Sequence, residues 1–274
     1  MVCGFVTVAT ILCLSINALA IGRVVILVPA AADIFYKIGA TDTVVGVTNN
    51  VMEFPDAAKV GTHLNPAVEK IASLRPSLVV TTPGFDADII RRMGAEPFVY
   101  TPKTLREIIN YVRILAKKIG KEAEGEALAV SLEKILDELH PVTGQRPTVL
   151  YETRSTPLGL ARGNSIIINI LETAGFRYAY SETGGTVSAE YLLGNQPDYY
   201  IYQEGPMNRN PVVPSKRQGW SSFNACAWKV DEFAFARPNT IVFQTVRELN
   251  EILTGDNPCE AGRKHYKGRN KNPK

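Results

Sequence analysis

The chain has 274 residues, a mass of 30.0 kDa and a formal net charge of +3, and 45% of its residues are hydrophobic. This composition is typical of a globular protein and argues against a disordered, collagen-like or multi-spanning membrane chain. The excess positive charge lies in residues 262–274, which hold six basic residues and no acidic one. Residues 1–261 carry 24 basic and 27 acidic residues, a net charge of −3. Nucleic acid is therefore not an expected partner.

Residues 1–20 contain no charged side chain. The apolar stretch Val6–Leu14 and the small residues up to Ala20 are typical of a secretory signal peptide, so we expect export with cleavage after Ala20. Retention as a membrane anchor is the alternative, because about 20 apolar residues can span a bilayer. Export leads to an oxidising compartment, in which Cys226 and Cys259 either pair or remain free thiols. The sequence leaves both outcomes open.

Residues 21–102 are predicted to form a first α/β lobe. Short apolar runs predict strands at 23–28, 44–47, 78–81 and 97–100, and helical spacing predicts helices at 32–38, from 66, and at 87–93. Strands that alternate with helices at these lengths indicate a parallel sheet.

Residues 103–141 are predicted to be a helical connection. A capping box at Thr104 starts a helix that reaches about residue 119, and a second helix runs from about 121 to 139. About 18 helical residues extend about 27 Å, which is enough to bridge two lobes. The predicted fold class is therefore α/β, with two lobes containing parallel sheets, a long rigid interlobe helix and a ligand cleft between the lobes.

Residues 142–254 are predicted to form the second α/β lobe. The pattern predicts strands at 148–151 and 199–202 and helices at 165–173, 189–193 and 243–253. From residue 255 to residue 274 the chain is polar and basic, which predicts a disordered tail.

An internal repeat connects the two lobes. Glu69 precedes a short apolar helix, Pro76 and a strand, and Glu190 precedes the same series with Pro197. The spacing matches without gaps, and the two glutamates are 121 positions apart. The repeat predicts two lobes of similar architecture.

Motifs of the common enzyme classes are absent from the sequence, including the phosphate-binding glycine loops, the zinc-protease motif and the nucleophile elbow. The three histidines, His63, His140 and His265, are widely spaced, whereas a catalytic zinc usually needs three protein ligands. We therefore expect a protein without catalytic residues, bound metal or cofactor.

Several segments resemble a known family. The segments RVVILVPAAADIFYKIGATDTVVGVTNN, VGTHLNPAVEKIASLRPSLVVTT, GNSIIINILETAGF, TVSAEYLLGNQPDYYIY and DEFAFARPNTIVFQTVRELNEIL are similar to periplasmic substrate-binding proteins of ABC importers for iron–siderophores, cobalamin and haem. The resemblance covers about residues 23–254. It implies a ligand held between two lobes and little movement on binding. It also implies that Glu69 and Glu190 dock on the permease, although an acid in the first turn of a helix also stabilises that helix.

Loops at the carboxyl ends of the strands supply the ligand-binding candidates. They are aromatic or arginine side chains suited to an anionic chelate through charge-assisted bonds and stacking, namely Phe85, Tyr151, Arg154, Arg162, Tyr202, Arg209 and Trp220. Trp220 and Trp228 either close over the ligand or fill the core, and the sequence does not decide between these roles.

The expected function is capture of a metal chelate of the iron–siderophore type and its delivery to the transmembrane permease and its ATPase, by an exported monomer. A receptor for cobalamin, haem or an oxyanion is the alternative within the family. A chelatase-like enzyme with two lobes is the alternative from another class, and it would need an acid/base or metal cluster in the cleft.

Overall fold

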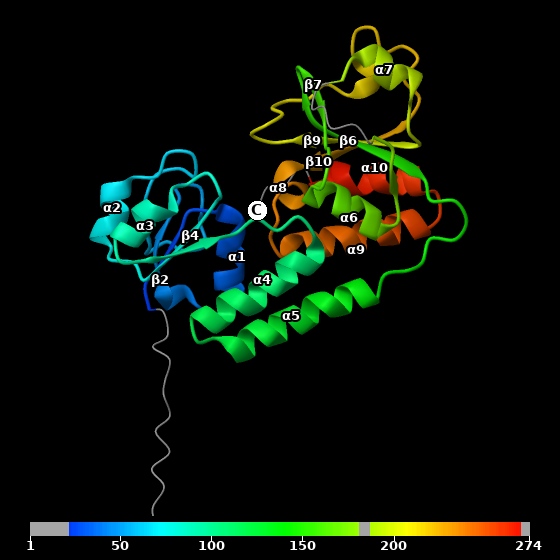
Figure 1. Ribbon diagram of the computed structural model, residues 1–274. Helices are drawn as coiled ribbons and strands as arrows, with labels where there is room; N and C mark the ends of the chain where they lie inside the picture. The colour runs from blue at the N-terminus through cyan, green and yellow to red at the C-terminus, as the bar shows by residue number, and fades with distance from the viewer. Residues whose placement is uncertain (1–21, 181–186, 270–274) are drawn as a thin grey trace, which may run out of the picture.

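The computed structural model describes residues 22–180 and 187–269 and shows two α/β lobes joined by a pair of helices (Figure 1). The first lobe is built on five parallel strands in the order β3-β2-β1-β4-β5. Its elements are β1 Val24–Ile26, α1 Pro29–Lys37, the 3-10 turn η1 Thr41–Thr43, β2 Val44–Val47, β3 Ala58–Lys59, α2 Val68–Ser73, β4 Leu78–Thr81, α3 Ala87–Arg92 and β5 Glu96–Val99. The central strands β1 and β4 are buried along their whole length, as their continuous apolar runs predict for a sheet with helices on both faces.

The second lobe contains a sheet in the order β10-β9-β6-β7, with β8 paired to the first part of β6. The hairpin β6–β7 is antiparallel, and the other pairs are parallel. Its elements are β6 Thr148–Ser155, β7 Leu158–Leu160, α6 Ile166–Ala174, β8 Arg177–Tyr178, α7 Ala189–Gly194, β9 Tyr199–Glu204, η2 Pro214–Lys216, β10 Cys226–Asp231, α8 Glu232–Phe235, α9 Ile241–Thr254 and α10 Pro258–Arg269.

The repeat predicted from the sequence is present in the fold. Strands β2-β1-β4-β5 of the first sheet correspond in order and direction to strands β8-β6-β9-β10 of the second. Glu69 lies in the first turn of α2 before β4, and Glu190 lies in the first turn of α7 before β9. Each lobe is therefore built on the same βαβ arrangement.

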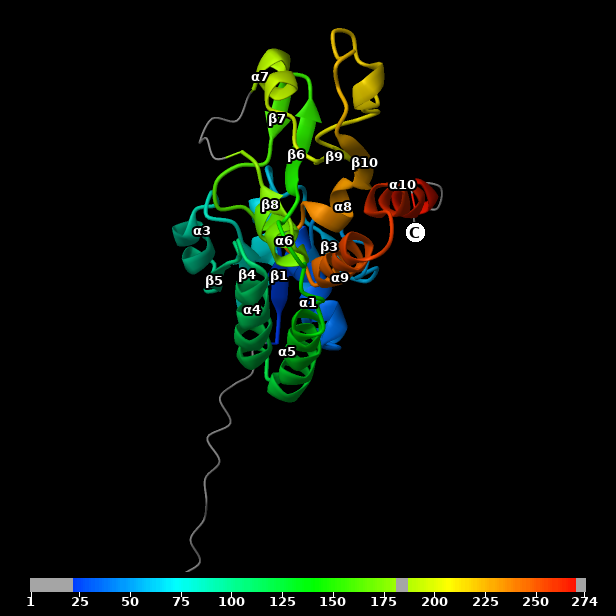
Figure 2. The same ribbon diagram turned by 90° about the vertical axis from the view of Figure 1, so that its right-hand side faces the viewer.

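The connection consists of two helices, α4 Leu105–Lys118 and α5 Glu122–Asp137, which lie side by side (Figures 1 and 2). The predicted cap is confirmed, because the Thr104 hydroxyl accepts the Glu107 amide at 3.1 Å. The two helices pack so closely at Gly125 that a Cβ atom there would lie 2.1 Å from the Ala116 Cβ. Glycine at this position therefore permits the close helix contact.

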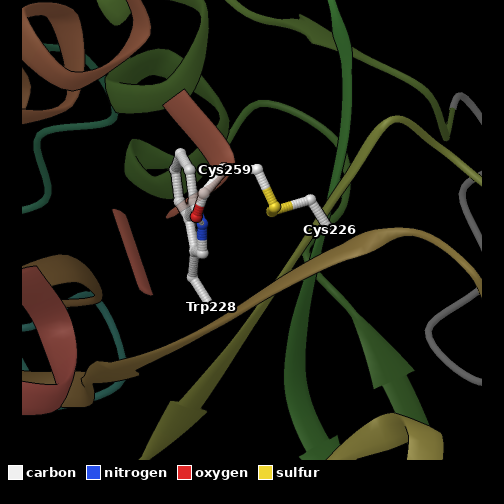
Figure 3. The surroundings of a disulfide bond; sticks show 3 residues. All are labelled: Cys226, Trp228 and Cys259. Atoms are coloured by element: carbon white, nitrogen blue, oxygen red, sulfur yellow. Dashed lines mark hydrogen bonds between the residues drawn. A yellow bond between two sulfur atoms is a disulfide. The ribbon is translucent and has the colours of Figure 1, made fainter. Parts of the chain in front are cut away.

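The prediction of a disordered C-terminal tail is wrong for residues 258–269, which form α10. This helix is attached to β10 by the disulfide Cys226–Cys259, whose Cα atoms are 5.8 Å apart (Figure 3). The indole Nε1 of Trp228 donates to the Cys259 carbonyl at 3.1 Å, and Tyr266 is 4% exposed. The sequence did not indicate this helix, because only a narrow stripe of its residues is buried and its other residues are mostly polar.

One apolar core continues through both lobes and the connection. It runs from Ile34 and Phe35 of α1 through Val112 of α4 to Ile170 of α6 and Val246 of α9. Burial of shared apolar surface opposes separation of the lobes. Within residues 22–180 and 187–269, no helix is long and apolar enough to cross a membrane. The predicted signal peptide lies outside the described residues.

Candidate ligand-binding site

The two lobes meet where the strands of the first sheet end. Tyr100 directly follows β5, and its hydroxyl donates to the Pro238 carbonyl of the second lobe at 2.6 Å. Thr240 of the second lobe donates its backbone N–H to the Asp33 carboxylate of α1 at 2.8 Å. Figure 1 shows α8 on the side of the second lobe that faces the first lobe. The segment after β10 therefore packs against the carboxyl-end edge of the first sheet, where binding loops of α/β proteins gather.

Arg237 is a half-buried cation at this lobe junction. Its guanidinium carbon lies 3.7 Å from the centroid of the Phe233 ring, in cation–π contact. Burial lowers the pKa of Arg237, while the carboxylates of Glu232, Asp231 and Glu53 oppose that shift. Glu53 belongs to the first lobe, so Arg237 interacts electrostatically with carboxylates of both lobes. Arg237 was not among the residues predicted from the sequence, although it lies within a segment that carried the family resemblance.

A buried ion pair holds the long loop that follows β9. Glu152 of β6 is fully buried, and Arg217 binds it with two nitrogens at 2.6 and 3.0 Å. The Tyr200 hydroxyl also donates to Glu152. Burial alone lowers the pKa of Arg217, but its bonds to Glu152 raise that pKa above the usual value. The guanidinium lies over Trp220, 4.7 Å from the ring centroid.

Asn208 extends this network to the start of the same loop. Its amide nitrogen donates to the Gln203 carbonyl at 2.9 Å and to Glu152 at 3.3 Å, and its oxygen accepts the Ser155 amide at 3.0 Å. Gln203 in turn accepts the Tyr151 hydroxyl at 3.0 Å. The network fixes both ends of residues 205–217 to the sheet. Tyr151 was predicted as a ligand contact, whereas the other members of the network share no motif that could have indicated them.

Large apolar side chains are exposed on the carboxyl-end loops of both lobes. Met52 and Leu64 follow β2 and β3 in the first lobe and are 77% and 85% exposed. Met207 follows β9 and is 61% exposed, and Phe233 on α8 is 42% exposed. These four side chains come from separate loops, and they offer apolar contact area on the side where binding loops of α/β proteins lie.

The structure divides the predicted ligand-binding residues into two groups. Tyr151, Tyr202 and Trp220 are at most 6% exposed, and they fill the interior of the second lobe instead of lining an open surface. Trp228 is also buried, in contact with α10. For both tryptophans the structure therefore favours the core role that the sequence had left open.

The remaining candidates have partly or fully exposed side chains, three of them on loops and Arg154 near the end of β6. Phe85 is partly exposed after β4, in the first lobe. In the second lobe Arg162 and Arg209 are exposed, and Arg154 donates from Nε to the Pro157 carbonyl at 3.0 Å in the turn between β6 and β7. These four residues remain predictions for ligand contact.

The two candidate docking residues are exposed, and each starts a short helix. Hydrogen bonds from its own backbone N–H and from Ser188 lower the pKa of Glu190, so it is charged near neutral pH. Figure 1 shows α2 on the outer side of the first lobe and α7 at the far end of the second. Both carboxylates are therefore accessible to a partner.

A groove of about 650 Å³ lies on another part of the molecule. It is formed where α4 begins and α5 ends against α6 and α9, and its lining includes Arg106, His140, Arg146, Asn169 and Asn250. The groove contains none of the predicted ligand-binding residues. In the described part of the chain, no group of three or more His, Cys, Asp or Glu side chains is arranged to hold a metal ion.

Comparison with known proteins identifies the family. Residues 24–225 match the periplasmic binding protein family. The chain belongs to this family. Its members bind their ligands outside the cytoplasm and do not convert them.

Two curated relatives and one solved structure show the extent of the similarity. The chain is 25% identical over 256 residues to the ABC transporter substrate-binding lipoprotein YvrC of Bacillus subtilis, covering 85% of this chain and 80% of that protein. It is 22% identical over 245 residues to the vitamin B12-binding protein of Vibrio parahaemolyticus, with coverage of 84% and 86%. A possible iron-binding periplasmic protein from Staphylococcus epidermidis has the same fold, with a TM-score of 0.71, 18% identity and coverage of 86% and 99%. The predicted fold class is confirmed.

Proposed function

We propose that this substrate-binding protein captures a metal chelate of the iron–siderophore type between its two lobes and delivers it to an ABC permease. The observation that carries the proposal is the lobe junction, where the exposed Phe233 and the half-buried Arg237 of the second lobe lie close enough to the first lobe for Glu53 to act on Arg237. Cation–π and charge-assisted contacts of such side chains suit a chelate with aromatic or carboxylate groups.

Cobalamin is the second candidate, and the exposed apolar side chains favour it. Met52, Leu64 and Met207 offer uncharged contact area to a large ligand. One relative in the family is a vitamin B12-binding protein. A bare metal ion has less support, because it would need a set of close His, Cys or carboxylate ligands.

The proposed route of delivery uses one carboxylate from each lobe. Glu69 and Glu190 occupy equivalent places in the repeated architecture, and both are exposed. Paired with arginines of the permease, which works with its ATPase, they would hold both lobes of the loaded protein at once. We further propose that residues 1–20 direct export and that they either are removed or anchor the protein at the membrane.

The ligand proposal is tested by equilibrium dialysis of the purified protein against ferric citrate, a ferric hydroxamate, cyanocobalamin and hemin. Saturable binding of one ferric chelate, with weaker binding of the others, is the expected result. Tightest binding of cyanocobalamin would replace the chelate proposal with the second candidate. Binding of none of the four compounds would contradict both.

The docking proposal is tested with the double variant Glu69→Ala/Glu190→Ala in a transport assay. We expect uptake to fall at least tenfold while the dissociation constant of the ligand stays within about twofold, because neither residue lies on the carboxyl-end loops. The control is Glu122→Ala, which changes another exposed acid in the first turn of a helix. Unchanged uptake in the double variant would contradict the docking role.

A further inference from the structure

Helix α9 begins at the lobe junction, where the preceding Asn239 accepts the Ile241 N–H through Oδ1 at 3.1 Å but the N-cap side chain itself does not cap the helix. Thr240 is the N-cap residue of α9, and its hydroxyl forms no capping bond to the helix. The first turn of α9 also contains no acidic residue. The positive end of the α9 macrodipole therefore receives no negative charge from its own turn.

A carboxylate from the other lobe occupies this place. Asp33 of α1 accepts the backbone N–H of Thr240 at 2.8 Å and its hydroxyl at 2.5 Å. Asp33 and Thr240 are 8% and 2% exposed, so water competes little for these bonds. Lys37, one turn further along α1, lies 3.6 Å from the Asp33 carboxylate and also donates to the Thr240 hydroxyl. The Lys37 ammonium thus compensates the negative charge of Asp33.

The same short segment carries the proposed ligand contact. Arg237 is three residues before Thr240, and the Pro238 carbonyl between them accepts the Tyr100 hydroxyl. Any movement of Thr240 away from α1 would therefore also shift Arg237. Apolar packing alone is non-directional and fixes such a register less strictly than buried hydrogen bonds do.

We propose that Asp33 is the positioning residue that fixes the two lobes relative to one another, by capping α9 across the lobe junction. The lobe geometry is then set by this cap together with the α4–α5 connection. The consequence for ligand affinity rests on the proposed function, whereas the structural consequence does not.

The second lobe contains a matched control for this contact. Asp198 accepts the backbone N–H and the hydroxyl of Thr148, both at 2.7 Å. The chemistry is the same as at Asp33, a carboxylate that accepts twice from one threonine. Asp198 is more exposed than Asp33, and Asp198 and Thr148 belong to the same lobe, so the loss of this bond pair does not affect the lobe junction.

The test is hydrogen exchange of the full-length protein with the variants Asp33→Ala, Asp33→Asn and Asp198→Ala. In Asp33→Ala we expect amide exchange of residues 239–245 to accelerate about 5- to 30-fold, which corresponds to the loss of an N-cap. The Leu105 amide at the start of α4, which donates to Asn169 of the second lobe at 2.8 Å, should also exchange faster, because it joins the second lobe to the α4–α5 connection that completes the lobe geometry. Asp33→Asn keeps one acceptor oxygen and should show a smaller effect.

Two results would overturn the proposal. One is acceleration confined to the first turn of α9, with Leu105 protected as in the wild type, which would make Asp33 a local cap only. The other is equal opening of the junction in Asp198→Ala. If Asp33→Ala does not fold, Asp33→Asn provides the same comparison.

Ligand binding is measured separately on the same variants, with whichever of ferric citrate, ferric hydroxamate, cyanocobalamin or hemin the wild type binds. We expect faster dissociation from Asp33→Ala and unchanged dissociation from Asp198→Ala. Faster amide exchange at the lobe junction together with an unchanged dissociation rate of the ligand would show that Asp33 positions the lobes but not the ligand site. This result would overturn the proposed effect of Asp33 on ligand affinity. If the wild type binds none of these probes, the proposed function fails while the exchange experiment still decides the role of Asp33.

Discussion

The two lobes have the same strand order, but they stabilise their carboxyl-end loops differently. In the first lobe, α1 follows β1 after two residues, and the loops after β2 and β3 are held by backbone hydrogen bonds and by exposed side chains such as Asn49, whose Oδ1 accepts the Gly61 N–H at 3.2 Å. In the second lobe, the chain makes the hairpin β6–β7 and a long loop after β9, held by the buried pair of Glu152 and Arg217. The comparison shows that a duplicated scaffold can keep its sheet while one copy acquires loops that are held by a buried ion pair.

The edges of the two sheets also differ. Strand β5 ends the first sheet, while β10 of the second sheet is covered by α10 through the disulfide and Trp228. The family match ends at residue 225, one residue before Cys226. The covered edge is thus a feature of the segment that follows the matched region.

The largest effect should come from removal of the buried carboxylate that supports the second lobe. Glu152→Ala leaves the Arg217 guanidinium without its partner and removes the acceptor for Tyr200. We expect a loss of about 3–5 kcal/mol in the free energy of unfolding, measured by urea denaturation. The control is Glu126→Ala, which breaks an exposed pair with Arg113 and should cost about 1 kcal/mol or less. Equal losses in the two variants would show that the buried pair contributes no more to stability than an exposed ion pair does.

The next effect concerns the disulfide at the edge of the second sheet. The double variant Cys226→Ser/Cys259→Ser opens a loop with a sequence separation of 33 residues, and we expect a loss of about 2–4 kcal/mol. Trypsin should then cleave within α10, at Arg263, Lys264 or Lys267, before it cleaves the rest of the chain. Cleavage at these sites that is as slow as in the disulfide-bonded protein would show that packing of Trp228 and Tyr266 holds α10 without the bond.

The smallest effect concerns a hydrogen-bonded contact that occupies the equivalent position in each lobe. Ser77 in the first lobe accepts the Arg23 amide at 3.2 Å, and Asp198, its equivalent in the repeat, accepts the Thr148 amide and hydroxyl. Bonds from Thr148 lower the pKa of Asp198. Its contribution to stability is therefore present above the unfolded pKa of about 3.9 and is lost as the pH falls through the folded pKa. Because the residue is largely exposed, we expect about 1 kcal/mol or less.

The measurement is the free energy of unfolding between pH 6 and pH 2 for the wild type, Asp198→Asn and Ser77→Ala. Asp198→Asn should flatten the decline in stability below about pH 4, because the titrating carboxylate is gone. Ser77→Ala should lower the curve without changing its slope. If the free energy of unfolding declines equally with falling pH in the wild type and in Asp198→Asn, the predicted loss of the Asp198–Thr148 contact in acid is wrong.

Much of the scaffold was predictable from local pattern. The strands at 44–47 and 78–81, the capped start of α4 and the repeat around Glu69 and Glu190 all appear as expected. These features depend on periodicity, capping residues and apolar runs, which are properties of neighbouring residues. Strand β10 was not predicted because Lys229 and Asp231 interrupt its apolar run.

The candidate site was less predictable because its geometry depends on contacts distant in sequence. Tyr151 and Tyr202 follow the rule that residues near the ends of strands line a site, yet both point into a packed interior. Arg237 was not selected because its position depends on the cross-lobe contacts of Tyr100 and Asp33. A single sequence carries no signal for a pair that is more than 200 positions apart, such as Asp33 and Thr240.

The most direct test of a ligand held between two lobes is hydrogen exchange of the wild type with and without the compound that binds in dialysis. We predict protection in the carboxyl-end loops of both lobes, at residues 48–56 and 82–86 of the first and 205–212 and 232–238 of the second. Protection confined to one lobe, or to residues that line the groove between α4, α5, α6 and α9, would contradict the account.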